Sequence, residues 1–235
     1  MWDNAPLLRA IAGMLTAASI LAMAYGAVHY TTHLPGLFPL REVRLDTVPE
    51  KVDSRQVLQV VRSVAYGNMF TVDLEKLRKA LEQLPWVRNV SIRREFPYSL
   101  EIQLEEHQAL ARWNDTQLVN RMGEVFVADS KEDLPSFFGQ EGTATEVTQE
   151  YEQFSNLLSA LNLQVLQLTL SPRHAWQLKL SNGIVVELGR EDMEPRLARF
   201  VEAYPGSIAS LQDRVRYVDL RYRNGFAVGW LTKQG

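Results

Sequence analysis

A long apolar run near the N-terminus is the clearest pattern in the chain. Between Ala10 and Leu40 there is no Asp, Glu, Lys or Arg. At about 1.5 Å per residue, a helix over Leu7–Val28 would be about 33 Å long, close to the roughly 30 Å hydrocarbon core of a bilayer. Arg9 lies one turn in, where its side chain can reach the headgroups. The pattern predicts a membrane-spanning helix over residues 7–30 after a short tail of residues 1–6.

Charges beside this helix predict its orientation. Arg9 and the terminal amine favour a cytoplasmic N-terminus, which exports nearly everything after the helix. Tyr25 and Tyr30 would then be interfacial anchors at the far end. A cleavable signal peptide is the alternative, because Ala22-Met23-Ala24 resembles a small-residue cleavage site. The length of the apolar run and the single basic side chain before it favour the anchor.

The next segment predicts a strand, two helices and a hairpin. The strand covers residues 40–45. One helix starts at Asp53 or Ser54 and the other at Asp73, residue types that cap helix N-termini. Two segments with period-two alternation then flank the connection Pro97-Tyr98-Ser99 and predict a hairpin. The apolar helix faces comprise Val57, Leu58, Val61 and Val64, then Leu74, Leu77, Leu81 and Leu84, before Pro85.

The rest of the chain predicts short strands and two helices. Strands are expected at residues 109–113, 118–119, 125–126, 163–170, 176–180, 184–188, 215–220 and 226–230. Asn182-Gly183, between two of these strands, is the strongest hairpin signal in the sequence.

The two helices of this part are predicted from one-sided apolar stripes. The first presents Tyr151, Phe154, Leu157, Leu158 and Leu161 on one face. The second is expected to be capped near Asp192, to carry Leu197, Phe200, Val201 and Tyr204, and to end at Pro205-Gly206. We expect residues 129–148 to form a mobile stretch, because Pro135, Gly139 and Gly142 interrupt it.

These elements predict an α+β protein with two folded units beyond the membrane helix. Residues 38–107 have the order β-α-α-β-β, and residues 108–235 form a mixed, β-rich unit with two helices. The composition is ordinary for a globular protein, with 46% hydrophobic residues and a net charge of −3. That charge argues against bulk electrostatic binding to nucleic acid. The absence of cysteine excludes thiolate catalysis and disulfides.

The sequence contains no recognisable set of catalytic residues. His29 and His33 flank the membrane segment, while His107 and His174 lie in different units and lack a metal-ligand spacing. Nucleophile elbows, Gly-rich phosphate loops and His-Glu-x-x-His motifs do not occur. The sequence therefore predicts no catalytic, cofactor-binding or metal site, and no small-molecule substrate.

Short motifs in the first unit occur in an ordered series. The series is Gly67-Asn68-Met69-Phe70, Val72-Asp73-Leu74, Leu84-Pro85-Trp86-Val87, Arg94-Glu95-Phe96-Pro97 and Leu100-Glu101-Ile102. In this order and spacing the segment resembles a POTRA domain. Its first strand, residues 40–45, and the junction at residues 67–73 are candidate contact surfaces.

A second series of motifs continues to the C-terminus. The series comprises Glu106-His107-Gln108-Ala109-Leu110-Ala111-Arg112-Trp113, Leu118-Val119-Asn120, Gly123-Glu124-Val125-Phe126, Trp176-Gln177-Leu178, Leu188-Gly189-Arg190, Arg196-Leu197-Ala198-Arg199-Phe200, Tyr217-Val218-Asp219-Leu220-Arg221-Tyr222 and Gly225-Phe226-Ala227-Val228-Gly229-Trp230. With the tail and the single span, essentially the whole chain resembles the bacterial cell-division family FtsQ/DivIB, in its proteobacterial branch. The resemblance implies a non-enzymatic scaffold in the inner membrane at the division septum, with periplasmic C-terminal domains.

The last predicted strand is the most informative surface. Large residues Phe226, Val228 and Trp230 alternate with Ala227 and Gly229, which leaves one face nearly bare. At a sheet edge, free N–H and C=O groups of such a strand can accept a strand of another chain. The residues alone leave an equal alternative, in which Trp230 fills the core at a chain end.

The family resemblance implies specific partners. FtsB and FtsL would dock on this exposed C-terminal edge strand by strand addition, and FtsW, FtsI and FtsK are further candidates reached through the span and the POTRA region. The implied partner-binding residues are Arg173, Arg221, Tyr222, Asn224, Gly225, Phe226 and Trp230. For Arg214 and Arg216 a solvated face is an equal alternative. The family commonly has Ser-Gly where this chain has Asn224-Gly225, so a side-chain hydroxyl is absent here.

Two other functions stay open at this point. A POTRA-containing chaperone or secretion-accessory protein of the envelope is one, although residues beyond 107 have too few strands for a membrane barrel. An exported enzyme with an unrecognised site is the other.

Overall fold

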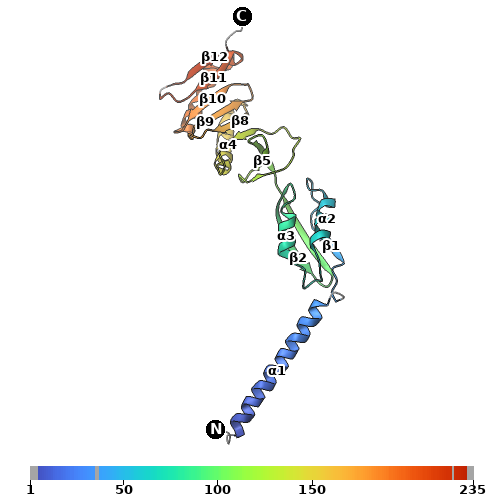
Figure 1. Ribbon diagram of the computed structural model, residues 1–235. Coiled ribbons are helices and arrows are strands. Elements are labelled where there is room, and N and C mark those ends of the chain that lie inside the picture. Colours follow the sequence, from blue (N-terminus) through green and yellow to red (C-terminus); the bar gives the residue numbers. More distant parts are fainter. Residues whose placement is uncertain (1–4, 35–36, 224, 232–235) are drawn as a thin grey trace. The chain divides into compact units, whose positions relative to one another are not determined.

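The computed structural model describes residues 5–34, 37–223 and 225–231. Contacts within the chain group into two units, Met1–Glu106 and His107–Gly235. The first unit contains α1 (Ala5–His33), β1 (Glu42–Leu45), α2 (Ser54–Val64), α3 (Leu74–Leu81), β2 (Val87–Glu95) and β3 (Ser99–Glu106), labelled in part in Figure 1.

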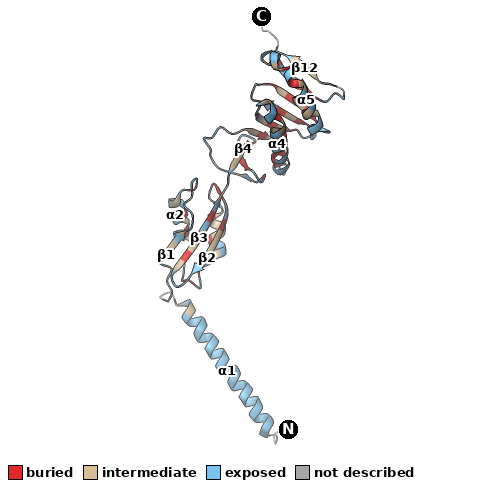
Figure 2. Ribbon diagram, turned by 180° about the vertical axis from the view of Figure 1, so that it is seen from behind, coloured by how far each residue is buried: buried red, intermediate tan, exposed pale blue. Residues whose placement is uncertain are grey.

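Helix α1 is a single continuous helix of 29 residues without a buried side chain. Figure 2 shows it exposed along almost its whole length. In the part of the chain that is described, it is the one helix long and apolar enough to cross a membrane. It contains the predicted span, residues 7–30, and extends beyond it at both ends.

The POTRA-like part of the first unit is a two-layer arrangement. Its sheet has the order β1-β3-β2, in which β1 runs parallel and β2 antiparallel to β3. Helices α2 and α3 pack against each other, and α3 also contacts β2. The shared core comprises Val57, Val61, Leu77, Leu81, Leu100 and Ile102. Leu58, predicted on the apolar face of α2, is instead exposed.

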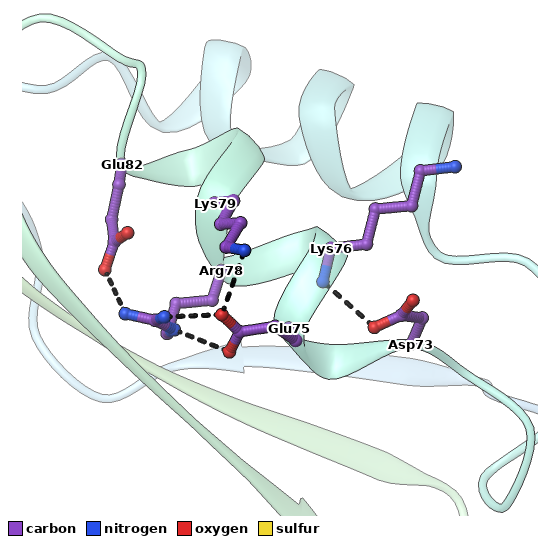
Figure 3. A network of polar contacts seen from close by, with 6 residues as sticks. All are labelled: Asp73, Glu75, Lys76, Arg78, Lys79 and Glu82. Atoms are coloured by element: carbon purple, nitrogen blue, oxygen red, sulfur yellow. Dashed lines mark hydrogen bonds and ion pairs between the residues drawn. The ribbon is translucent and has the colours of Figure 1, made fainter.

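Helices α2 and α3 both begin where their capping residues predict. An oxygen of Asp53 accepts a hydrogen bond from Arg55 N at 2.8 Å, and one of Asp73 accepts from Lys76 N at 3.0 Å. Figure 3 shows the second cap beside an ion-pair network on α3, where Arg78 lies between Glu75 and Glu82. Glu75 is exposed and Arg78 and Glu82 are half-buried at the surface, so the network contributes only modestly to stability. The helix ends at Leu81, before the predicted Leu84-Pro85 stop.

The second unit is built on one long mixed sheet with the order β12-β11-β10-β9-β8-β7-β4-β5-β6. Helix α4 packs on β8, and helix α5 packs on β10 and α4. Between them the helices and strands bury one continuous core that includes Phe137, Phe154, Trp176 and Phe200. The elements are β4 (Ala109–Trp113), β5 (Gln117–Asn120), β6 (Val125–Phe126), β7 (Ser136–Phe138), α4 (Ala144–Leu158), η1 (Ser159–Leu161), β8 (Val165–Leu170), β9 (Trp176–Leu180), β10 (Val185–Gly189), α5 (Met193–Ser207), η2 (Ala209–Arg214), β11 (Val215–Asp219) and β12 (Ala227–Trp230).

The predicted mobile stretch, residues 129–148, is wrong in its middle and at its end. Strand β7 lies inside it, paired in parallel with β4 on one side and β8 on the other. Phe137, at the centre of β7, is fully buried. Helix α4 also begins within the stretch, at Ala144. Three residues are too few to show an alternating pattern, so tertiary packing rather than local sequence forms this strand.

Helix α5 differs from its prediction at both ends. Asp192 lies just before it but has a left-handed backbone with φ 51° and makes no side-chain cap. The helix also continues through Pro205 and ends at Ser207. Tyr204, in this last turn, is buried beside Phe200, and the centroids of the two rings lie 5.4 Å apart.

Glu150 on α4 carries a carboxylate in an unfavourable position. One of its oxygens is buried and has no hydrogen-bond partner among the described residues. Burial raises the pKa of this carboxyl above its ordinary value of 4.5, and the charges of Glu194 and Glu146 raise it further. Because the folded state holds the proton more tightly than the unfolded state, Glu150 lowers stability increasingly as the pH rises above about 4.5.

Glu150→Gln is therefore expected to raise the thermal midpoint at pH 7 by about 2 °C, and the gain should vanish near pH 4. Scanning calorimetry of the full chain in mild detergent at both pH values measures this. Glu152→Gln, at an exposed position of the same helix, is the control and should leave the midpoint unchanged. An equal gain at both pH values would contradict the assigned cause.

Candidate partner-binding site

Strand β12 forms one end of the nine-stranded sheet and pairs antiparallel with β11. Phe226 and Val228 pack partly buried against the core of the unit. Trp230 has the same parity in the strand, yet it is 54% exposed. The exposure argues against the alternative in which this tryptophan fills the core.

The free edge of β12 has a defined set of backbone groups. Leu231 N donates to Arg214 O at 2.8 Å, so the odd-numbered residues of β12 face β11. Because successive residues of a strand alternate in direction, Val228 and Trp230 point their N–H and C=O groups away from β11. No second strand covers them in the described part of the chain. This edge can add a strand from another molecule.

The opposite face of β12 is not bare, contrary to the sequence expectation. Gly229 lies opposite Tyr217 of β11, and a Cβ added at Gly229 would overlap the tyrosine ring. The ring of Tyr217 is itself 43% exposed. Glycine at this position therefore makes room for a neighbouring aromatic ring within the same chain.

Arg221, one of the predicted site residues, makes several polar contacts within the chain. Its guanidinium donates to both carboxylate oxygens of Asp219, Nε to Oδ1 at 2.8 Å and Nη2 to Oδ2 at 2.6 Å. These hydrogen bonds hold the pKa of Asp219 below its ordinary value, and that of Arg221 is raised. The positive charge of Arg221 is thus already matched within the chain, which the sequence did not indicate.

Strand register brings Arg173 and Arg221 to one end of the sheet. Trp176, at the start of β9, lies opposite Gly189, at the end of β10. Strands β10 and β11 are parallel, so the β8–β9 turn with Arg173 lies at the same end as Arg221 and the start of β12. Arg173 and Tyr222 are both exposed. Asn224 lies outside the described residues.

A hollow of about 530 Å³ opens beside the start of β12. Gly225 and Phe226 line it together with Arg196, Arg199 and Arg223. The arginines of α5 also brace the surrounding backbone, since Arg196 donates to Leu188 O at 2.7 Å and Arg199 to Arg223 O at 2.5 Å. Sequence reasoning missed Arg196 and Arg199 as site residues, although their spacing of three on one helix placed them on a common face.

Among the described residues there is no group of three or more His, Cys, Asp or Glu side chains that could hold an ion.

The fold and this edge define a class: an α+β protein with one candidate membrane span, a small POTRA-like unit and a larger unit whose sheet ends in an open strand. Comparison with known families identifies both units. Residues 38–107 match the FtsQ-type POTRA domain, and residues 111–221 match the C-terminal domain of the cell division protein FtsQ/DivIB. The chain belongs to the FtsQ/DivIB family, which confirms the predicted family and fold class.

Individual relatives cover the chain almost end to end. The cell division protein FtsQ of Nitrosospira multiformis is 43% identical over 97% of this chain and 98% of its own length. The FtsQ protein of Burkholderia pseudomallei is 41% identical over 97% of this chain and 94% of its own length. The Escherichia coli protein is 41% identical over 70% of this chain and 62% of its own. The first two similarities, which cover 97% of the chain, extend through the candidate span as well as both folded units.

Proposed function

We propose that this protein is a single-pass inner-membrane scaffold of the divisome that recruits FtsB and FtsL through β12 and links early and late division proteins at the septum. Residues 1–6 lie in the cytoplasm, residues 7–30 span the membrane, and the POTRA domain and the C-terminal domain are periplasmic. The protein acts by binding, without chemistry of its own. FtsW, FtsI and FtsK are further candidate partners, reached through the span and the POTRA domain.

The open edge of β12 is the observation that carries this proposal. Its outward backbone groups fit an added strand, and the exposed ring of Trp230 gives that strand an apolar contact of the kind that dominates binding energy. Phe226 and the arginines around the neighbouring hollow fit a segment that carries apolar and acidic side chains. Arg221, whose side chain is 60% exposed, also holds the turn after β11 through Asp219.

Trp230→Ala is expected to weaken capture of the FtsB–FtsL pair by about thirtyfold, because it removes about 2 kcal/mol of contact at the edge. Titration of the full chain in nanodiscs with the purified pair measures the change. Leu166→Ala, which truncates another exposed apolar side chain of the same sheet on β8, should bind as the unaltered protein does. Equal affinity for both variants would remove Trp230 from the interface.

A further inference from the structure

Three phenylalanines form an exposed cluster on the POTRA domain. The rings of Phe38 and Phe70 meet edge to face with centroids 5.2 Å apart, and those of Phe70 and Phe96 lie 5.5 Å apart. Their exposed fractions are 39%, 43% and 56%. Contiguous apolar surface of this kind on a soluble domain marks an interaction site.

The cluster lies next to the end of the candidate membrane span. Phe38 follows His33, the last residue of α1, by five positions, so an extended chain keeps it within about 18 Å of the helix end. The side chain of Asn68 also donates to Thr32 O at 2.7 Å and Leu34 O at 3.1 Å. The loop that carries Phe70 is thereby attached to the C-terminal end of the same helix.

The loop holds Phe70 outward with its backbone already satisfied. Oδ1 of Asn68, a buried side chain, accepts from Phe70 N at 2.9 Å and Thr71 N at 3.0 Å. The guanidinium of Arg94 donates to Met69 O at 2.7 Å and to Val72 O. Hydrogen bonds within the domain therefore satisfy these backbone N–H and C=O groups of the loop. The group that the loop exposes to its surroundings is the aromatic ring of Phe70.

The backbone at Phe38 has an unusual conformation that contacts with the same loop maintain. Its φ is 55°, in the left-handed region that bulky side chains rarely adopt. Met69 N donates to Phe38 O at 3.0 Å, and Pro39 forms a bridge with Asn68. A strained conformation that its surroundings maintain points to a functional requirement for that orientation.

The surroundings of the cluster fit a phospholipid surface. Aromatic rings concentrate at membrane–water interfaces, where a flat apolar body can enter the headgroup layer. Arg41 stacks over the ring of Tyr98 at 4.7 Å, which places a guanidinium beside the cluster where phosphates of anionic lipids could bind it. Glu95, the acidic residue before Phe96, is matched by Arg44 at 3.3 Å.

We propose that Phe38, Phe70 and Phe96 insert into the headgroup layer of the bilayer that α1 spans and hold the POTRA domain against the membrane surface. The proposal rests on the membrane anchoring that is part of the proposed function. Its occupant is lipid, so a protein contact at this cluster is a competing result.

Site-directed spin labelling tests this on the full chain. Because the protein has no cysteine, Phe96→Cys and Phe70→Cys each supply a single thiol for a nitroxide. Each variant is reconstituted into vesicles of phosphatidylethanolamine and phosphatidylglycerol, and collision rates with oxygen and with a water-soluble nickel chelate are compared. We expect an oxygen-to-nickel ratio several-fold higher at both positions than at Val48→Cys, an exposed position beyond the opposite end of β1.

The outcomes separate this proposal from the anchor on which it rests. Leu15→Cys, in the middle of α1, should show high oxygen and low nickel collision rates; a nickel-accessible label there defeats both the anchor and the lipid contact. A lipid-accessible Leu15 with Phe96 and Phe70 labels as nickel-accessible as Val48 defeats the lipid contact alone. Labels shielded from both reagents would overturn it in favour of a protein contact. Circular dichroism of each variant verifies that the domain is folded.

Discussion

Val228→Pro is expected to weaken capture of the FtsB–FtsL pair by about thirtyfold or more, whereas Val228→Ala is expected to stay within a few-fold of the unaltered protein. Val228 points its N–H away from β11. Proline removes this donor and places its ring where an added strand would approach. One lost ladder bond and the steric contact together amount to about 2 kcal/mol, which corresponds to the stated change.

Alanine is the matched control because both variants lose the same isopropyl group. That group packs partly buried against the core, so each variant gives up similar packing. Only proline changes the outward backbone, and the bonds between β12 and β11 remain available to it because they come from the odd-numbered residues. A difference in affinity between the two variants therefore reports on backbone pairing with the partner.

Titration calorimetry or surface-bound capture with the full chain in nanodiscs measures both affinities. Thermal unfolding of each variant checks that β12 stays folded on β11. Proline and alanine variants of equal affinity would show that the partner does not add a strand at this edge, even if side chains such as Trp230 contribute to binding.

The POTRA domain was largely predictable because its signals are local. Asp53 and Asp73 cap helices through their own side chains, and the hairpin of β2 and β3 follows from strict alternation. Each of these features needs only a few neighbouring residues, so the pattern and the fold agree. The edge position of β12 was harder, since no local pattern distinguishes an edge strand from a central one; only the order of the sheet does.

What the sequence could not show depends on contacts between distant residues. The sequence of β12 alone predicts a bare face at Gly229. In the structure, the ring of Tyr217 on the neighbouring strand covers this glycine. Asp219 pairs with Arg221 across a turn, so a residue predicted to bind a partner also fixes the chain beside β12, and its partner contact stays a prediction. Arg196 and Arg199 reach the same region from α5. The candidate site is thus wider than its predicted residues and more basic on the helix side.

Strand β7 lies in the segment that the sequence predicts to be mobile, yet a substitution in it is expected to cause a large loss of stability. Phe137→Ala is expected to destabilise the second unit by about 3–5 kcal/mol, the usual loss for a fully buried phenylalanine. Its ring lies 4.8 Å from that of Tyr151 on α4, and its strand bridges β4 and β8. Removing it leaves a cavity at the join between the two halves of the sheet.

Hydrogen exchange of the full chain in mild detergent, measured at increasing urea concentration, shows which segments lose stability. Peptides from β4, β7 and β8 should lose protection at lower urea, while those from the POTRA domain should not change, because their core is separate. Phe138→Ala, at the half-buried neighbouring position, is the control and is expected to lose about 1 kcal/mol. If both substitutions had the same small effect, β7 would be peripheral to the core, and the two halves of the sheet would not depend on it for their stability.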